Sequence, residues 1–378
     1  MTGRGVPLRR DRRGIALALV LWVLVIGATL LTLALLVAVQ EQRASGAERR
    51  LQHGFADAEA GLAAALDEWT PTALRLVLPR SLDSLMFGGT LDGGGRSWRG
   101  VLRRLSPTLF LVEVTVDALP DDGAGPLRAQ VRLGRLIETR VPSVALSAAL
   151  SVGGAAVLGA DTRVDGRDTT PPWRADCPDP DSGVTGLAAG SATLLSGATV
   201  AGAPPMALRP ATDSTLALQD SAVFDQLASR ADMVLPGGTW STLPATVGTA
   251  CDMTDVQNWG APSDPLSPCS EYLPVVHISG DATLASGEGQ GILLVDGNLS
   301  LATSYSFYGI ILVRGRFSMS ASPGRTAIIG AVAAGSVGTP SAAAQGLAIH
   351  YSKCLINNAL LSSGVLAPLP SRAWKQLY

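Results

Sequence analysis

RRGIALALVLWVLVIGATLLTLALLVAV, residues 12–39, sets the architecture of this chain, because a basic leader and one glycine run directly into an uncharged apolar segment. Ile15 to Val39 comprises 25 residues without Asp, Glu, Lys or Arg. As a helix, this run spans roughly 37 Å at about 1.5 Å per residue, enough to cross a hydrocarbon core of about 30 Å with some tilt. The sequence therefore predicts a transmembrane helix over residues 15–39.

A cleaved secretory signal does not fit this segment. The apolar part of such a signal is about 7 to 15 residues long and is followed closely by a small-residue cleavage site. A permanent signal anchor remains an alternative, as does a stem that stays on the protein after its leader is removed.

The polar segment after Val39 continues the helix. Its apolar residues recur every three or four positions, which is the period of an amphipathic helix: Leu51, Phe55, Ala58, Leu62, Leu66 and Trp69. Pro71 disfavours helical geometry at Thr70, so the helix is expected to end there. The prediction is one stem of about 50 residues, with residues 40–70 as the amphipathic half.

Charge gives the expected orientation. Five arginines precede the helix against one aspartate. The positive-inside rule then predicts a cytoplasmic leader and a single pass through a bacterial inner membrane, with everything after about residue 40 outside the cytoplasm. The arginines are Arg4, Arg9, Arg10, Arg12 and Arg13.

Short strands are expected beyond the stem. Residues 101–105, 109–117 and 127–137 have β-like patterns, separated by Ser106-Pro107 and by a Pro120–Pro126 turn region. A small antiparallel sheet over residues 71–142, packed on the amphipathic half of the stem, follows.

A tandem repeat marks the rest of the chain, which is rich in Gly, Ala, Ser and Thr. GILLVDGNLSL, from Gly291, is followed eighteen residues later by GIILVRGRFSM, from Gly309, and a looser copy starts at Ala327. A strand, a glycine turn and a second strand at a near-constant offset favour a β-solenoid. A β-sandwich with two similar hairpins is the alternative. The expected fold class is α+β: leader 1–14, membrane helix 15–39, amphipathic continuation 40–70, small β region 71–142 and an all-β, solenoid-like head 143–378.

All four cysteines fall in the part expected to be exported, where disulfides persist. Their spacing matches no zinc pattern. Three connectivities are possible. The short loop favours Cys251 with Cys269, which leaves Cys177 to pair with Cys354.

No catalytic motif is present: the sequence lacks G-x-S-x-G, a P-loop and H-E-x-x-H. Asp296 and Arg314 occupy equivalent places in the repeat and are interpreted as solvated turn residues, and His277 and His350 as residues at the edge of the core. Asp179 and Asp181, before Gly183, suggest half of a calcium loop, but a later acidic ligand is missing. We expect no enzyme activity, no cofactor and no resident metal, with calcium left open. The net charge of −2 and the lack of a basic stripe give no indication of a nucleic-acid partner.

The junction at Gly14 resembles the site that a prepilin peptidase cuts, which implies cleavage between Gly14 and Ile15. FADAEAGL, residues 55–62, is similar to the alanine-rich AEAG element of PilX-type pilus assembly proteins and of related minor pseudopilins. The glycine-rich pattern of residues 289–315 also resembles the C-terminal half of PilX-like proteins. The resemblance covers roughly residues 12–66 and 252–378.

One position departs from the pilin pattern. Major pilins carry a glutamate at the fifth residue of the mature chain, where this sequence has Leu19. Its absence, with the ALALVLWVL opening, is similar to the large minor pseudopilin of type II secretion, and implies a minor subunit that primes assembly or sits at a tip.

The expected function is that of a minor pilin-like or pseudopilin-like subunit. Its expected partners are a prepilin peptidase, the membrane, and other pilin or pseudopilin subunits contacted through the stem, with the β head displayed for roles such as adhesion. The alternative is a membrane-anchored β-solenoid that binds surface or cell-wall polysaccharide and never enters a fibre.

Overall fold

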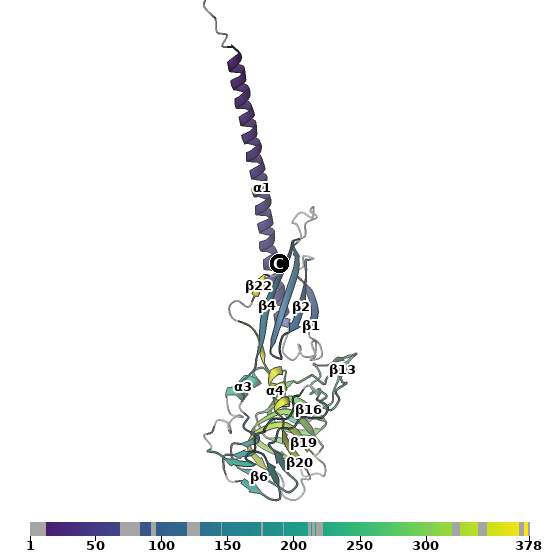
Figure 1. Ribbon diagram of the computed structural model, residues 1–378. Helices are drawn as coiled ribbons and strands as arrows, with labels where there is room; N and C mark the ends of the chain where they lie inside the picture. The colour runs from purple at the N-terminus through teal and green to yellow at the C-terminus, as the bar shows by residue number, and fades with distance from the viewer. Residues whose placement is uncertain are drawn as a thin grey trace, which may run out of the picture.

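The computed structural model describes residues 13–68, 84–91, 96–118, 129–144, 146–174, 177–191, 193–210, 213, 216, 222–302, 304–319, 326–338, 346–369 and 374–376. Three parts follow one another along the molecule: a long helix, a small sheet, and a large β-rich region at the end away from the start of the helix (Figure 1). Residues 1–12 of the expected leader, and the expected end of the stem at Trp69 to Pro71, lie outside the described residues.

The first part is α1, a helix from Arg13 to Glu68. Its sequence is rich in Leu and Ala and contains no proline, so no residue interrupts the backbone hydrogen bonds. Inside the apolar half, the hydroxyl of Thr29 donates to the carbonyl of Ile26, and that of Thr32 to the carbonyl of Ala28. These bonds satisfy the polar groups within the helix itself. One continuous helix spans the membrane-type segment and its amphipathic continuation.

The second part is an antiparallel sheet that packs on the last turns of α1. Ala58, Leu62 and Ala65 are buried against Trp98 and Leu102. The sheet has the order β1, β2, β3, β4, and both β21 and β22 pair with β4. The strands are β1 (Ser84–Leu91), β2 (Arg96–Arg104), β3 (Leu109–Ala118), β4 (Ala129–Arg140), β21 (Val365–Pro368) and β22 (Trp374–Gln376). The expected small antiparallel sheet is confirmed, and the two C-terminal strands are an addition to it.

The third part contains a 14-stranded sheet in which every described pairing is parallel. A separate hairpin joins β13 to β14. The strands are β5 (Ala148–Val152), β6 (Ala156–Leu158), β7 (Arg163–Asp165), β8 (Thr185–Ala189), β9 (Thr193–Leu195), β10 (Thr199–Ala201), β11 (Met206–Leu208), β12 (Met233–Ser241), β13 (Thr246–Val247), β14 (Ala250–Cys251), β15 (Val275–Ser286), β16 (Glu288–Val295), β17 (Leu299–Leu301), β18 (Ser306–Met319), β19 (Thr326–Gly338) and β20 (Leu347–Tyr351).

Equivalent positions of the sequence repeat are register partners in neighbouring strands. Gly291 pairs with Gly309, Leu294 with Leu312, and Leu299 with Phe317, as the aligned copies predicted. β16 and β17 both lie between β15 and β18, so these four strands close a ring of pairings. Apolar side chains from successive strands, such as Ile292 and Ile310, form one buried core.

A row of glycines allows the strands to approach closely. Gly291, Gly309 and Gly330 are register partners, with φ of 99°, 138° and 146°. A Cβ on Gly309 would lie 2.1 Å from the carbonyl oxygen of Gly291. Only glycine fits both this space and this backbone conformation.

Side chains at the neighbouring turns also link one strand level to the next. Oδ1 of Asp281 accepts from the backbone N–H of Asn298 at 2.7 Å, and Oδ1 of Asn298 accepts from the N–H of Arg316 at 2.8 Å. Each short polar side chain therefore satisfies a turn N–H that follows it by one repeat.

The strand order of this sheet differs from the chain order. From one edge it runs β12, β15, β16, β18, β19, β20, β7, β10, while β5 and β6 also pair with β19. Strands that come early in the chain, such as β5, β6 and β7, thus pair with β19 and β20, the last strands of this sheet in the chain. Two short helices flank the sheet: α3 (Ala222–Ala228) contacts β15 and β16, and α4 (Lys353–Ser362) contacts β16, β18 and β19.

Candidate functional site

The most exposed apolar surface of the molecule is the first half of α1. From Leu17 to Val39 its large apolar side chains are between 38% and 71% exposed, with Trp22 the most exposed. Among the described residues, α1 is the one helix long and apolar enough to cross a membrane. Such a surface is costly to leave in water, because each buried CH₂ contributes about 0.8 kcal/mol.

The expected processing and assembly positions all lie near the start of this helix. α1 begins at Arg13, so Gly14 and Ile15 are in its first turn. Leu19 lies one turn further on and is 61% exposed. Leu19 therefore belongs to the exposed apolar surface.

The two disulfides have the pairing that the sequence favoured. Cys251 bonds to Cys269, and Cys177 bonds to Cys354. The first pair closes a separation of 18 residues and the second a separation of 177. The first therefore shapes one loop, whereas the second ties together distant parts of the β-rich region.

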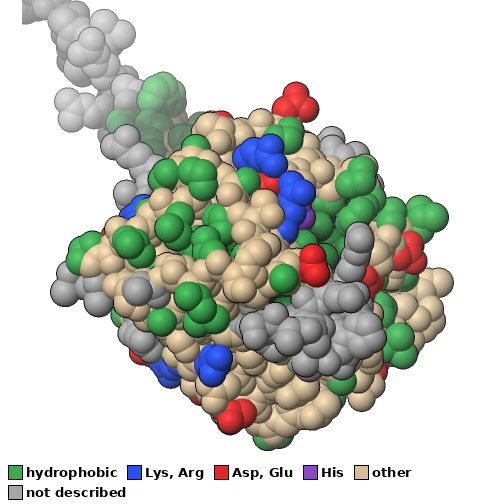
Figure 2. All heavy atoms as spheres, turned by 90° about the horizontal axis from the view of Figure 1, so that it is seen from below, with side chains coloured by type: hydrophobic (Ala, Val, Ile, Leu, Met, Phe, Trp, Pro, Cys, Tyr) green, Lys and Arg blue, Asp and Glu red, His purple; other side chains and the backbone are tan. Residues whose placement is uncertain are grey.

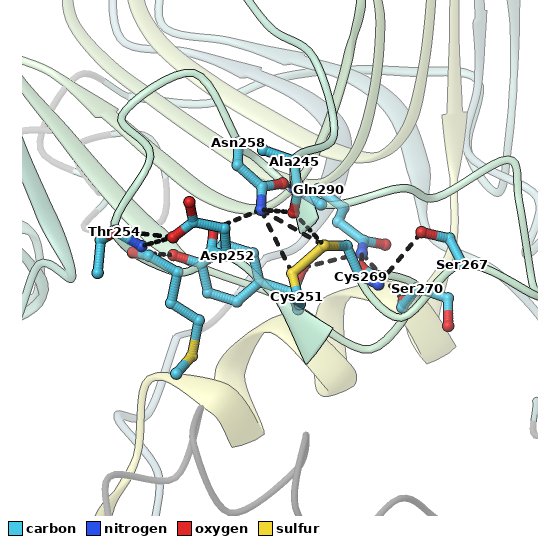
Figure 3. The surroundings of a disulfide bond; sticks show 12 residues. Ala245, Cys251, Asp252, Thr254, Asn258, Ser267, Cys269, Ser270 and Gln290 are labelled. Carbon is cyan, nitrogen blue, oxygen red and sulfur yellow. Dashed lines mark hydrogen bonds between the residues drawn. A yellow bond between two sulfur atoms is a disulfide. The ribbon is translucent and has the colours of Figure 1, made fainter. Parts of the chain in front are cut away.

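A buried amide cluster surrounds the Cys251–Cys269 disulfide (Figure 3). Nδ2 of Asn258 donates to the carbonyls of Asp252 at 2.6 Å and Ala245 at 3.1 Å. These bonds fix the loop as a rigid unit, since both amide donors of a fully buried side chain are used.

Gln290, on β16, attaches this loop to the parallel sheet. Its Nε2 lies within hydrogen-bond distance of three loop carbonyls, those of Tyr272 at 2.8 Å, Ser270 at 3.0 Å and Cys269 at 3.1 Å. The loop and the segment just before it display several exposed apolar side chains despite this attachment: Leu243, Val247, Met253, Val256 and Leu266.

The second disulfide lies beside a group of charged residues. The carboxylate of Asp168 accepts from the backbone N–H groups of Asp181 and Lys353, both at 2.9 Å. Nζ of Lys353 lies 2.7 Å from Asp181, and this contact lowers the pKa of the Asp181 carboxyl. Asp181, one of the two residues considered for calcium, is thus engaged by a cation. No group of three or more metal-ligating side chains occurs within the described ranges, which include Asp179.

Asp296 and Arg314 do come together, as neighbours in the repeat. Arg314 Nη1 lies 2.8 Å from Asp296, whose other oxygen lies 3.0 Å from Nε2 of His277. Helix α3 completes the cluster, because Asp225 pairs with Arg314 and the Phe224 ring lies 4.1 Å below the guanidinium. Opposite charges paired in this way hold a helix on a sheet. Phe224 and Asp225 lie far from the repeat in sequence, and no sequence signal identified them.

A similar cluster surrounds His350. The buried carboxylate of Asp165 accepts from Arg167 at 2.7 Å and from Arg163 at 3.1 Å, which holds its pKa well below the usual range. His350 is the register partner of Asp165. Burial, and then the charge of Arg163, lower the pKa of the His350 imidazole. His350 is therefore partly buried on β20, between β19 and β7, consistent with its interpretation as a residue at the edge of the core.

The end of the molecule away from α1 is predominantly uncharged. Figure 2 looks at this end, where apolar side chains are spread among neutral ones. The outer strands of the parallel sheet supply exposed apolar residues: Val157, Leu194, Leu195, Met206 and Leu208.

Comparison with protein-family models finds no model that matches this chain. A search of curated proteins likewise finds no match.

Proposed function

We propose that this chain is a minor pilin-like or pseudopilin-like subunit that assembles through α1 into a type IV pilus or a type II secretion pseudopilus. The observation that carries the proposal is that the two halves of α1 have different surroundings. Its first half exposes only apolar side chains and small residues to the surroundings, while its second half buries Ala58, Leu62 and Ala65 under a small sheet. A helix of this kind serves both as a membrane anchor and as the core strut of an extracytoplasmic domain.

Assembly in this proposal proceeds by transfer of the apolar stem between two apolar environments. The stem lies in the bilayer until a prepilin peptidase removes the leader after Gly14, and then packs among neighbouring stems. Because Leu19 has no charge, this subunit makes no ion pair there with the terminal amine of a neighbour. It joins a fibre by apolar packing alone, which suits a minor subunit present in few copies.

The β-rich region is proposed to be a β-solenoid displayed outside the cytoplasm. Three features support this interpretation: parallel pairing throughout, the stacked glycines at 291, 309 and 330, and the turn-to-turn bonds of Asp281 and Asn298. Register offsets support it too, since Val275 pairs with Ile292 and Ile292 with Ile310. The predominantly uncharged end in Figure 2, which lies away from α1, is then free for contact with another surface.

The localisation proposed is the inner membrane, with a single pass and the head outside. The arginines of the leader support a cytoplasmic N-terminus. The disulfides support an oxidising compartment for the head.

The test is N-terminal mass spectrometry of the protein isolated from its native membrane. A mature chain that begins at Ile15 is expected, and Gly14→Glu is expected to leave the leader attached. Gly5→Glu, in the same leader, is the matched control and should be processed normally. An intact leader on the wild-type chain overturns the proposal and favours the alternative, an anchored polysaccharide-binding β protein.

A further inference from the structure

The parallel sheet stops at three short strands, at the end of the molecule away from α1. β9, β10 and β11 pair with β6, β7 and β8, respectively, and among the described strands each has only that one neighbour. They follow one another along residues 193–208, so together they form one level of the sheet, which we call the end level. β6, which pairs with β9, lies at the far end from α1 in Figure 1.

The end level exposes side chains that occupy core positions. Register partners in parallel strands point to the same side of the sheet. The partners of Leu195, Met206 and Leu208 are core residues with 0% exposure: Leu158, Leu187 and Ala189. In contrast, Leu195 and Met206 are each 41% exposed, and Leu208 is 64% exposed. The apolar core of the β-rich region is therefore open at this end.

The end level is also uncharged. Residues 183–208 contain no Asp, Glu, Lys, Arg or His. Arg209, which follows directly, pairs with Asp213 at 3.2 Å. Stacked repeats normally end in a level with a polar outer face, which keeps the core away from water. An uncharged level with open core positions is suited instead to cover by another protein surface.

We propose that the end level is a contact surface for the end level of a second copy of this chain. The partner must present an uncharged apolar patch of matching outline, and a second copy has this patch. Two facing copies bring no like charges together, and each covers the open core of the other. Because both copies use the same surface, the contact closes with two copies and does not extend into a fibre.

Addition of a foreign strand to the end level is less favourable. Pro204 and Pro205 lie directly before β11, and Pro210 lies two residues after it, and proline has no backbone N–H to offer. β9 and β10 are only three residues long, so they present few backbone groups to an added strand. Packing of apolar side chains, which needs no added strand, therefore carries the contact.

The size of the end level determines the strength of the contact. Met206 follows its register partner Leu187 by 19 residues, which is one circuit of the three strands. At about 3.3 Å per residue the outline measures at most roughly 60 Å, and a triangle of this perimeter encloses about 170 Å². Stable interfaces bury about 800 Å² per partner, so a single pair of copies associates weakly. Surfaces that carry many copies bind each other far more tightly.

The stems of two paired copies point in opposite directions, because the end level and the start of α1 lie at opposite ends of the molecule (Figure 1). With the head displayed outside the membrane, the pair joins two membranes or two fibres and not two neighbours in one membrane. This use of the contact rests on the proposed function, whereas the contact itself depends only on the end level.

The test measures tethering between phosphatidylcholine vesicles that carry the full-length protein. The protein is inserted from detergent into preformed vesicles, which leaves the head outside. Light scattering should show clusters of these vesicles, and labelled protein-free vesicles should stay outside the clusters. Tethering does not require cleavage after Gly14. Its failure therefore leaves the proposed function standing, and an intact leader leaves the contact standing.

Charges placed on the end level make the test specific. Leu208→Glu should lower tethering at least fivefold, because like charges then face each other across an apolar contact, and Leu208→Lys should do the same. Vesicles with Leu208→Glu should tether to vesicles with Leu208→Lys about as strongly as wild type does, which a misfolded head would not allow. Leu266→Glu, at an exposed leucine in the Cys251–Cys269 loop, is the matched control and should tether like wild type.

Four results would overturn the inference. The first is absence of tethering by the wild type, and the second is unchanged tethering by Leu208→Glu. The third is failure of the two oppositely charged variants to tether to each other, or an equal loss in the Leu266→Glu control. The fourth is capture of protein-free vesicles in the clusters, which would make lipid the occupant of the end level.

Discussion

Arg140 and Val365, which bracket the whole β-rich region in sequence, are direct partners in one antiparallel ladder. Arg140 ends β4, and Val365 begins β21 on the neighbouring position of the same sheet. The β-rich region is therefore an insertion into a smaller unit made of α1 and the antiparallel sheet. The chain leaves the small sheet at the end of β4 and returns to it at the start of β21, and these two points are adjacent.

The first prediction follows from this pairing. Replacing residues 142–363 by a two-residue Asn-Gly turn should leave the small unit folded, because such turns join neighbouring antiparallel strands directly. Circular dichroism and hydrogen exchange should show a protected β3–β4 ladder in the shortened chain. Loss of protection throughout the sheet would contradict the insertion.

A second prediction concerns the glycine row. Gly309→Ala should destabilise the β-rich region by more than about 3 kcal/mol, because its Cβ would meet the carbonyl oxygen of Gly291 in a backbone conformation that disfavours alanine. Chemical unfolding of the full-length protein measures the change. Gly46→Ala, in open space on α1, is the control and should be neutral or slightly stabilising.

A third prediction compares the disulfides. Replacing Cys177 and Cys354 by serine should cost about 5 kcal/mol, against about 3 kcal/mol for Cys251 and Cys269, because a cross-link constrains the unfolded chain more when its loop is longer. Denaturant midpoints of the two double variants give the comparison. A larger loss of stability for the Cys251 and Cys269 variant would contradict this prediction, because loop length would then not determine the stabilisation.

The fourth prediction tests the loop attachment at Gln290. Gln290→Leu removes a donor that lies within hydrogen-bond distance of three loop carbonyls and should cost about 1–3 kcal/mol. Hydrogen exchange of residues 258–273 should rise more than that of β18. Gln257→Leu, an exposed position nearby, should leave both unchanged.

The fifth prediction is a pH dependence. Burial lowers the pKa of His350 in the folded protein, so the unfolded chain binds a proton more readily. Stability from this group is complete above about pH 6.5 and falls as the pH drops toward the folded-state pKa. His350→Gln should therefore reduce the loss of thermal stability between about pH 7.5 and about pH 5. His53→Gln, on the exposed stem, should not change it.

Local patterns in the sequence account for much of the fold. The uncharged run and its amphipathic continuation predicted α1, because both the composition and the 3.6-residue period are local signals. The alternating residues of β3 and β4 predicted the small sheet for the same reason. The repeat predicted its own register, since Gly291 and Gly309 must stack for the strands to approach.

Long-range pairings lay beyond such signals. Nothing near Val365 marks it as a partner of Arg140, and nothing near Asp225 marks it as a partner of Arg314. The ion pairs of Glu113 with Arg103 and Arg132 were not predicted, because the three residues lie on three strands and come together only through the register. The role of Gly14 and Leu19 stays a prediction, because it depends on a peptidase and on neighbouring subunits.

Under the export that we propose for the head, the permuted strand order constrains how the chain folds as it emerges. Within the parallel sheet, β5, β6 and β7 would emerge first, yet their neighbours β19 and β20 are the last strands of that sheet in the chain. For most of translocation these early strands therefore present open backbone edges to the medium. Pro204, Pro205 and Pro210 flank β11, whose described pairing is with β8, and proline has no backbone N–H to offer to a further strand there. Folding of the proposed exported head would thus end when β19 and β20 pair with these early strands, after which Cys177 and Cys354 come within reach of each other and form the second disulfide.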